Sequence, residues 1–471
     1  MKNKFKKKTS VNQMPGWREY QDKLQKAGSR SRKFRYGVKL ITLACLFFLG
    51  AYLIIAGWRG RDSGHTDVHH DDALQPVAES NNKAKSAAPD YLLLKEEIQN
   101  LITAADIVNI QDESIKIVTE GSELRIETSI DIALQQFIMK KMKKSTSRYI
   151  GIVVMNPSNG RVLTMAGYDK TDPSGNPCLE NKFPAASIFK IVTAAAAIEK
   201  CGFSPQSDFK YNGRQHTLYK KQLKELNNKY TNHLTLKDSF AKSVNPVFGK
   251  LGAIYLGKHA LEEYADAFGF NSRICFEVEL PKSSMRISEN PYNWAEIACG
   301  FNRETRISPI HGALIASAIL NQGGLLEPTI VDRIVDARNR AVYSSHVTRV
   351  KQAIRPETSK AIRTLMMATV RYGTCRKSFR GYRGDRVLSK LNIGGKTGTI
   401  DNKAHDARYD WFIGFAEEKD GPGKIAISVL VAHEKYIGTR ASQYARLIMK
   451  EFFRDYFAKN KRRKPQSVNK S

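Results

Sequence analysis

The stretch Pro184-Ala185-Ala186-Ser187-Ile188-Phe189-Lys190 runs directly into an apolar segment, residues 191–198, and together they predict the start of a buried helix. In a helix that opens at Ser187, Lys190 lies one turn later on the same face. Its amine can then reach the serine hydroxyl and take its proton, and the helix N-terminus favours negative charge there. A serine is a weak nucleophile until a base activates it, so this pair predicts nucleophilic serine chemistry.

The Ser-x-x-Lys pattern carries little weight alone, because most such pairs are a solvated serine and lysine. It also occurs at Ser80/Lys83, Ser239/Lys242 and Ser467/Lys470. Two later motifs distinguish Ser187, namely Ser243-Val244-Asn245 and Lys396-Thr397-Gly398-Thr399. Taken singly, the first of these could be a helix cap and the second a turn at a strand end. The Lys-Thr-Gly triplet occurs once, after a β-type run whose small residues let a substrate backbone lie close to a strand edge.

Composition limits the class of protein. The 471 residues leave room for two or three domains, and 41% hydrophobic content supports a large core. The net charge is +30, and residues 1–39 hold 13 Lys/Arg against two acids. No zinc-knuckle, RNA-binding aromatic motif or basic heptad region accompanies this charge, which argues against nucleic acid. We expect the basic tail to face anionic membrane lipid, and the basic exterior to face lipid or cell-wall polymer.

Residues 40–58 form an uncharged, mostly apolar run that would span about 28 Å as a helix, close to the thickness of a bilayer core. A cleaved signal peptide has a shorter apolar core and a shorter basic lead. We therefore expect an uncleaved single-pass anchor in the cell membrane, with the tail in the cytoplasm and residues from Arg59 onward outside, in the periplasm. Residues 59–89 read as a polar linker, and its histidines and aspartates predict a solvated spacer rather than a metal site. No metal or cofactor is expected.

The apolar pattern predicts helices over 90–107, 131–144 and 440–457, and a largely helical stretch from Ser187 to about residue 322. It predicts strands over 115–118, 124–128, 149–155, 161–166, 391–394, 411–415 and 425–431. Strands at both ends with helices between predict an α/β sandwich around one mixed or antiparallel sheet. The expected divisions are a tail (1–39), an anchor (40–58), a linker (59–89), a small pre-domain (90–130), a main domain (131–457) and a basic C-terminal tail (458–471).

Five cysteines lie beyond the predicted anchor, in an oxidising compartment where a disulfide can form. An odd number leaves at least one thiol unpaired in a monomer. Their spacing predicts no particular pairing.

The order of the three motifs, and the segments 155–166, 298–312 and 410–415 around them, resemble the penicillin-binding protein transpeptidase family over about residues 128–457. The resemblance implies the penicillin-binding-protein/β-lactamase-like α/β fold, with a mostly helical subdomain beside the sheet. It implies that Ser187 is acylated by a D-Ala-D-Ala stem peptide of peptidoglycan, and that β-lactams acylate it as covalent inhibitors. Lys190, neutral in a cationic and partly dry pocket, would be the base, with its pKa lowered by the nearby Lys396, and Ser243 would pass a proton to the leaving amine.

The same resemblance assigns substrate binding to Asn245 and to the Lys396-Thr397-Gly398-Thr399 segment. Asn245 would hydrogen-bond the substrate amide. Lys396 and the hydroxyls of Thr397 and Thr399 would hold the terminal carboxylate. The backbone N–H groups of Ser187 and Thr399 would form the oxyanion hole.

Alternatives stay open within and beyond this chemistry. Residues 59–130 are too few for a glycosyltransferase domain, which favours a monofunctional transpeptidase. A D,D-carboxypeptidase or a β-lactamase would use water as the acceptor, but Glu277-Val-Glu-Leu-Pro281 lacks the asparagine of a class A deacylation loop. Asn245 stands where a class D enzyme has valine. A non-catalytic β-lactam sensor or cell-wall scaffold is the third candidate. The sequence does not identify the acceptor amine, or partners in elongation, division or sporulation.

Overall fold

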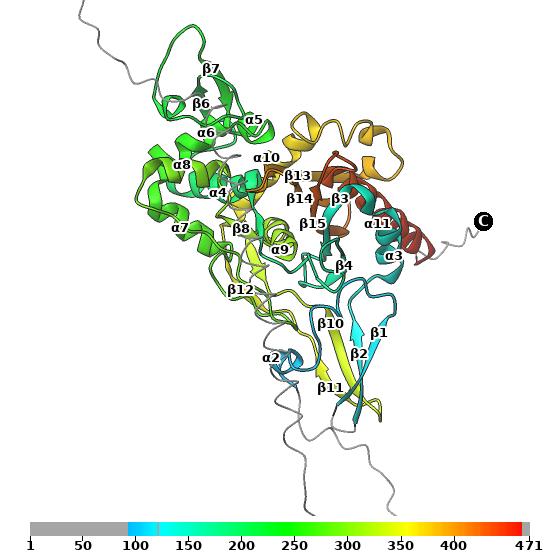
Figure 1. Cartoon of the computed structure of the whole chain (residues 1–471). Helices are drawn as coiled ribbons and strands as arrows, with labels where there is room; N and C mark the ends of the chain where they lie inside the picture. The colour runs from blue at the N-terminus through cyan, green and yellow to red at the C-terminus, as the bar shows by residue number, and fades with distance from the viewer. Residues whose placement is uncertain (1–92, 120–121, 464–471) are drawn as a thin grey trace, which may run out of the picture. The chain divides into compact units, whose positions relative to one another are not determined.

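The computed structural model describes residues 93–119 and 122–463 (Figure 1). The predicted anchor over 40–58 and the linker after it lie outside the described residues. Within the described ranges, no helix combines the length and apolar character needed to cross a membrane.

A five-stranded sheet forms the centre of the described chain. Its strands are β13 (Leu391–Asp401), β14 (Arg408–Glu418), β15 (Lys424–His433), β3 (Ser147–Met155) and β4 (Val162–Asp169), in that spatial order. All four pairings are antiparallel. The predicted early hairpin and the three predicted late strands are therefore confirmed, and they join where β15 pairs with β3.

Both faces of this sheet are buried, because alternate residues of each strand point to opposite sides. On β3, Val153 and Met155 belong to one apolar cluster, whereas Ile152 and Val154 belong to another. The first cluster includes α9 (Pro309–Leu320), whose residues are buried all round, as expected of a helix that is apolar on every face. The second includes α3 (Ile132–Lys141) and α11 (Ala441–Arg463), and Figure 1 shows these two helices on the side of the sheet away from α9.

The predicted helical stretch is present as a subdomain between β4 and α9. Its helices are α4 (Lys190–Cys201), α5 (Leu236–Ala241), α6 (Asn245–Lys250), α7 (Gly257–Ala267) and α8 (Pro291–Cys299), with a π-helical segment at Leu251–Leu256. Two short strands that the sequence did not predict, β6 (Asp208–Tyr211) and β7 (Asn232–Thr235), form an antiparallel ribbon within it.

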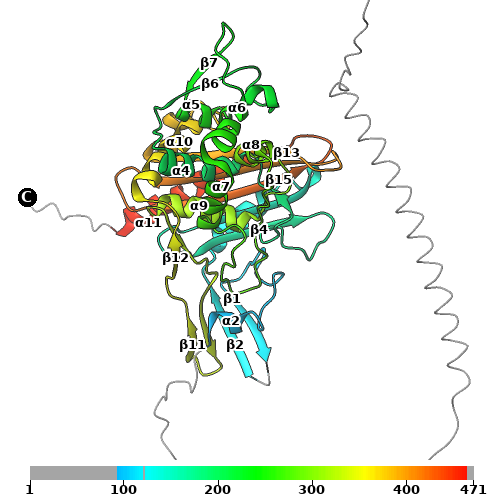
Figure 2. The same cartoon turned by 90° about the vertical axis from the view of Figure 1, so that its left-hand side faces the viewer.

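A second sheet joins segments from distant parts of the chain. Its order is β1 (Ser114–Thr119), β2 (Ser122–Thr128), β10 (Val331–Asp336) and β11 (Ala341–Ser344), and β2 pairs with β10. Figure 2 shows β1, β2 and β11 close together at one end of the described chain. The two strands predicted over 115–118 and 124–128 are thus confirmed. Further elements are β5 (Phe183–Pro184) paired with β8 (Arg306–Ile307), β9 (Gly324–Leu326) paired with β12 (Arg349–Gln352), and α10 (Pro356–Arg371).

The helix predicted over 90–107 is wrong. Helix α2 covers only Lys95–Ile98, and the chain then passes through turns. The carboxylate of Asp106 accepts hydrogen bonds at 2.7 Å from both the backbone N–H and the hydroxyl of Thr103, which favours a turn over a helix. Ile98, Ile102 and Ile107 are all buried. The spacing of these isoleucines therefore indicated that they are buried, but the backbone that buries them is a series of turns and not a helix.

The other two predicted helices are confirmed. Helix α3 begins after Asp131, whose carboxylate accepts the backbone N–H of Leu134 at 3.0 Å as an N-cap. Helix α11 continues past the predicted end at residue 457 to Arg463. All five described cysteines are free thiols.

Candidate active site

Ser187 lies in a 3-10 turn, Ala186–Phe189, which we call the serine turn, and α4 begins only at Lys190. The prediction that the serine itself opens the α-helix is therefore wrong by one turn. The serine turn follows directly after β5, which ends at Pro184, and the carbonyl of Pro184 accepts the indole N–H of Trp411 at 2.9 Å. Ala186 has φ +50°, a conformation that costs energy outside glycine. The tertiary contacts around β5 hold the serine turn in place.

Lys190 is fully buried and its Nζ lies among four oxygens. Its distances are 2.8 Å to Ser187 Oγ, 3.3 Å to Ser243 Oγ, 2.7 Å to Asn245 Oδ1 and 2.7 Å to the carbonyl of Cys299. The predicted contact between Lys190 and Ser187 is thus present, and the serine of the second motif lies beside it.

The character of these oxygens fixes what the amine can do. The carbonyl of Cys299 and the Oδ1 of Asn245 only accept hydrogen bonds. A neutral amine has two N–H donors and one lone pair, so with both donors used on these two oxygens the lone pair remains for a serine hydroxyl. Ser187 is the nearer hydroxyl. The arrangement therefore prepares Lys190 to accept the proton of Ser187.

Burial lowers the pKa of Lys190 to about 8. The sequence had assigned this shift to the charge of Lys396, and that assignment is wrong, because burial is the cause of lowering for Lys190. Of the two lysines, it is Lys396 whose pKa is lowered by the charge of its neighbour. The pKa of Lys396 lies well below its ordinary value, through its complete burial first and the charge of Lys190 second.

Ser243 lies between the two lysines. Its Oγ accepts hydrogen bonds from Lys190 at 3.3 Å and from Lys396 Nζ at 3.0 Å. Its φ is +57°, and α6 begins two residues later. Asn245 uses its other polar atom, Nδ2, to bond the carbonyl of His216 at 3.1 Å. Both ends of the Asn245 amide therefore have protein partners, and the residue holds Lys190.

The Lys-Thr-Gly-Thr segment is part of β13, and it packs against the serine turn. A Cβ on Gly398 would lie 3.2 Å from the Cβ of Ala186, closer than an ordinary contact, so glycine favours the close approach of the strand to the turn. Lys396 is buried and also donates to the carbonyl of Thr397 at 2.9 Å. Thr399 is exposed and Thr397 is half-buried, so both hydroxyls remain accessible from outside.

Two contributors to the site were not predicted. The carbonyl of Cys299 binds Lys190, and a backbone oxygen has no signature in sequence. Thr374 lies on the loop after α10, and its Oγ1 is 2.6 Å from Thr397 Oγ1. The rival serine is excluded from such a role, since Ser239 is fully buried in α5 and Lys242 is exposed.

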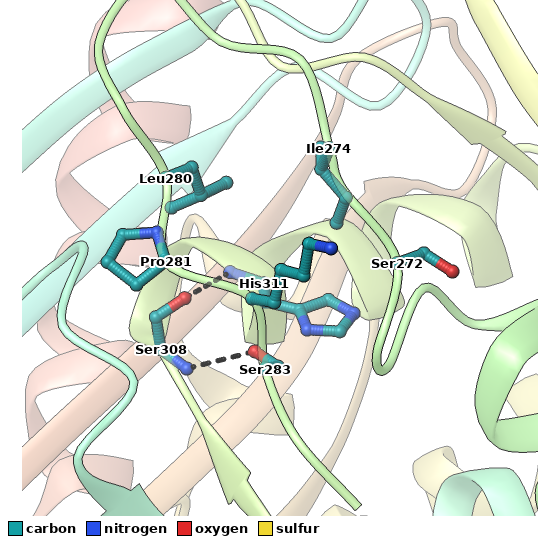
Figure 3. A pocket seen from close by; sticks show the side chains of 8 residues that line it. Ser272, Ile274, Leu280, Pro281, Ser283, Ser308 and His311 are labelled. Carbon is teal, nitrogen blue, oxygen red and sulfur yellow. Dashed lines mark hydrogen bonds between the residues drawn. The ribbon is translucent and has the colours of Figure 1, made fainter.

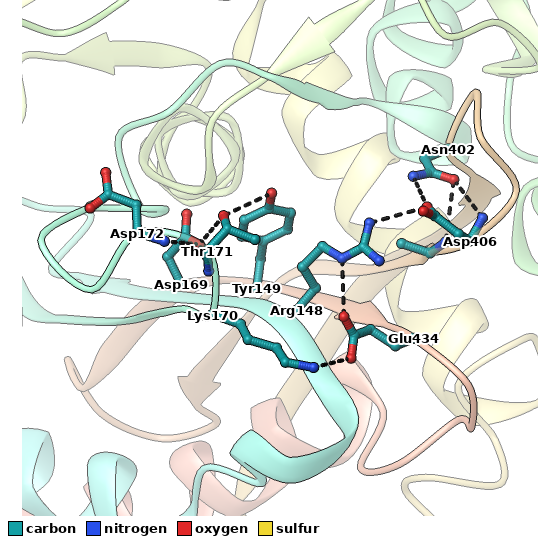
Figure 4. Close-up of polar contacts among 10 residues, drawn as sticks. Arg148, Tyr149, Asp169, Lys170, Thr171, Asp172, Asn402, Asp406 and Glu434 are labelled. Atoms are coloured by element: carbon teal, nitrogen blue, oxygen red, sulfur yellow. Dashed lines mark hydrogen bonds and ion pairs between the residues drawn. The ribbon is translucent and has the colours of Figure 1, made fainter. Parts of the chain in front are cut away.

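The loop that follows Thr399, residues 402–407, is tied to the sheet by a polar network (Figure 4). Arg148 on β3 donates to Asp406 at 3.1 Å and to Glu434 at 3.2 Å. Asn402 donates to Asp406 at 2.7 Å, and Lys170 donates to Glu434 at 2.6 Å. These hydrogen bonds lower the pKa of both carboxyls, so the network stays ionised at neutral pH.

A small cavity of about 10 Å³ lies beside His311 of α9, with room for about one water (Figure 3). The Nε2 of His311 lies 2.7 Å from the carbonyl of Phe268, which requires a proton on that nitrogen. Burial lowers the pKa of His311 to about 4. This histidine is therefore a neutral structural group beneath the helical subdomain.

A two-faced antiparallel sheet, with a lysine facing a serine hydroxyl at the start of a buried helix, is the architecture of serine enzymes that use a lysine as base. Residues 150–455 match the penicillin binding protein transpeptidase domain, and the chain belongs to this family.

Proteins of similar sequence support this family assignment. The chain is 28% identical over 321 residues to stage V sporulation protein D of Bacillus subtilis, covering 63% of this chain and 48% of that protein. It is 23% identical over 345 residues to the peptidoglycan D,D-transpeptidase PbpA of Mycolicibacterium smegmatis, covering 65% and 67%. The chain thus spans about half to two thirds of the length of these relatives.

Solved structures support the fold. The D,D-transpeptidase domain of a peptidoglycan glycosyltransferase from Eggerthella lenta superposes with a TM-score of 0.59 at 23% identity, over 70% of this chain and 83% of that one. Penicillin-binding protein A of Mycobacterium tuberculosis, solved as a ceftriaxone acyl-enzyme complex, gives 0.56 at 20% identity, over 69% and 78%.

Proposed function

We propose that this chain is a serine D,D-transpeptidase that cross-links peptidoglycan stem peptides through an acyl-enzyme on Ser187. The observation that carries the proposal is the set of contacts around Lys190, where two pure acceptors occupy the N–H groups and leave the lone pair to Ser187. Family membership, and relatives named as D,D-transpeptidases, support the same chemistry.

In this mechanism Ser187 Oγ attacks the carbonyl carbon of the penultimate D-Ala while its proton passes to Lys190. The backbone N–H groups of Ser187 and Thr399 stabilise the negative oxygen that forms. The intermediate then collapses, the peptide C–N bond breaks, and the leaving D-Ala amine takes a proton through Ser243. The amine of an acceptor peptide then attacks the acyl carbonyl, and the ester bond to Ser187 Oγ breaks. The new peptide bond is the cross-link, and Ser187 regains its proton.

Lys396 couples substrate binding to activation of the base. A substrate carboxylate beside Lys396, Thr397 and Thr399 favours the charged form of Lys396. The Nζ atoms of both lysines lie within hydrogen-bond distance of the same Ser243 oxygen, at 3.3 Å for Lys190 and 3.0 Å for Lys396, so a charge on Lys396 disfavours a second charge on Lys190. Binding of the carboxylate therefore promotes the neutral Lys190 that can accept the serine proton.

Glu277 supports transfer over class A-type hydrolysis. Its side chain is fully buried, and its carboxylate accepts hydrogen bonds from the hydroxyl of Thr329 and from the backbone N–H of Ile330. A carboxylate held this way is not available to activate a deacylating water. The carboxypeptidase alternative is tested by following the acyl-enzyme with and without an amine acceptor: release by water at the same rate in both conditions would favour hydrolysis.

Labelled penicillin tests the nucleophile. Ser187→Ala should abolish covalent labelling, and Lys190→Ala should slow acylation by about 10²–10⁴-fold, the loss expected for a proton-transfer group. The control is Ser239→Ala, which removes the buried rival serine and should label normally. Mass spectrometry locates the adduct. Labelling that survives Ser187→Ala would contradict the assignment, and failure of the intact protein to label would favour a non-catalytic scaffold.

We also propose that residues 40–58 anchor the protein in the membrane, with the basic tail against anionic lipid on the cytoplasmic side. The length of the apolar run and the flanking charge support this. Removal of residues 1–58 should leave a soluble protein that penicillin still acylates. A mature protein whose N-terminal residue lies beyond Trp58 would contradict the anchor.

A further inference from the structure

A cavity of about 580 Å³ lies between the C-terminal part of α10, the first half of β13 and the loop that follows α10. We call it the basic cavity, because four cations line it: Lys237, Arg371, Arg383 and Lys419. Apolar side chains, among them Met367 and Ile393, complete the lining. A cavity of this size can hold several residues of a peptide.

Most of this positive charge is not neutralised from within the protein. Lys237, Arg371 and Arg383 have no carboxylate partner among the residues that the structure describes, and Lys419 bonds only the carbonyl of Ser389 at 2.8 Å. Tyr372, which also lines the cavity, donates its hydroxyl to Asp238 at 2.7 Å.

The loop adds further charge. Segment 371–390 contains seven Lys/Arg residues and one acid, Asp385, which is paired with Lys450 at 2.6 Å. The basic cavity therefore attracts anions.

The basic cavity adjoins the proposed active site through two covalent connections. Ile393 lines the cavity and Lys396 follows three residues later on the same strand, about 10 Å away. Tyr372 lines the cavity, and two residues later Thr374 bonds Thr397 at 2.6 Å. A peptide whose end lies at Lys396 can therefore reach the cavity with residues a few positions from that end.

We infer that the basic cavity is a subsite for carboxylate-bearing residues of the peptide substrate, an inference that rests on the proposed function. Guanidinium groups bind carboxylates through paired hydrogen bonds, which suits Arg371 and Arg383. The apolar wall accommodates the aliphatic part of the same residues. The chain thus selects peptides that carry negative charge ahead of the D-Ala-D-Ala end.

The test measures binding to the full-length protein with Ser187→Ala, so that the peptide is not consumed. The probes are Ala-Glu-Glu-D-Ala-D-Ala and the matched peptide with Gln-Gln, which share the terminal carboxylate. We expect the Glu peptide to bind about threefold to tenfold more tightly, a range that allows for the exposure of both arginines to solvent. Arg371→Gln with Arg383→Gln should remove this preference.

The matched control is Arg376→Gln with Arg380→Gln, which removes the same charge from the same loop outside the cavity lining and should keep the preference. Equal losses in the two double variants, or no preference in the parent, would overturn the subsite. So would a double variant that weakens binding of inorganic pyrophosphate but not of the Glu peptide.

Penicillin acylation of the same double variants with Ser187 intact checks their folding, and Arg383→Gln alone replaces the double variant if it fails. Absence of acylation in the wild-type protein, with Ser187 present, would overturn the proposed function, whereas the peptide comparison in the Ser187→Ala protein is decided independently.

Discussion

A Cβ on Gly300 would lie 1.9 Å from the carbonyl oxygen of Ala186, the residue before Ser187. Gly300 is the C-cap residue of α8, with φ +69°, and its backbone packs directly against the serine turn. Gly300→Ala should therefore displace the turn, lower the free energy of unfolding by about 2–4 kcal/mol and abolish penicillin acylation. Thermal unfolding and labelling measure both effects.

Gly202→Ala is the matched control for this change. Gly202 ends α4 with φ +67° and has no atom within 4 Å of a Cβ built on it. Gly202→Ala should lower the free energy of unfolding by only about 1 kcal/mol, the cost of an alanine in the left-handed conformation, and should leave the acylation rate unchanged. Equal effects of the two substitutions would show that contact with the serine turn is unimportant.

The pH dependence of acylation should follow Lys190. Because the pKa of Lys190 is about 8, the neutral base is the minor form below that pH and the major form above it. The acylation rate constant should rise about tenfold per pH unit below 8 and level off above it. Stopped-flow acylation between pH 6 and pH 10 measures this, and a rate independent of pH would contradict Lys190 as the base.

Asp410 should position Thr399. Its buried carboxylate accepts the Thr399 hydroxyl at 3.5 Å and the backbone N–H of Ala441, at the start of α11, at 3.1 Å. Asp410→Asn places an amide donor among these donors and should cost about 1–3 kcal/mol of stability. It should also raise the KM for the peptide. Asp420→Asn, an exposed change on the next turn, should alter neither quantity.

Acid should destabilise the fold through His311. Its pKa is about 4 in the folded chain, against an ordinary value of 6.5, so between these values the unfolded chain binds a proton that the folded chain does not. The contribution to stability is full above pH 6.5, and about 3 kcal/mol is lost as the pH falls to 4. Chemical denaturation at several pH values should show a shallower slope for His311→Gln. The exposed His346→Gln should leave the slope unchanged.

The elements that sequence predicted well share a simple physical signal. Residues 149–155 and 161–166 are apolar runs around an Asn-Pro-Ser-Asn-Gly turn, and both became strands of the central sheet. The segment 90–107 failed because helical spacing and irregular burial look alike when only Ile98, Ile102 and Ile107 must face inward.

The site shows the same division. The convergence of Ser187, Lys190, Ser243 and Lys396 followed from motif order, because each side chain carries its own chemistry. The carbonyl of Cys299 and the hydroxyl of Thr374 were not foreseen, since one belongs to the backbone and the other to a loop with no motif. The cause of the lowered Lys190 pKa also needed the structure, because the sequence indicates only a partly dry pocket, whereas the side chain is completely buried and burial is what lowers its pKa.

The pairing of β2 with β10 sets an order of events during synthesis. About 200 residues separate these strands, so at 5–20 residues per second β2 emerges on the order of ten seconds or more before its partner exists. Until then the β1–β2 hairpin has an open edge that can pair with other chains. The early part of this protein therefore needs protection while the later part is being made, and a ribosome stalled between residues 128 and 331 would leave that edge unpaired.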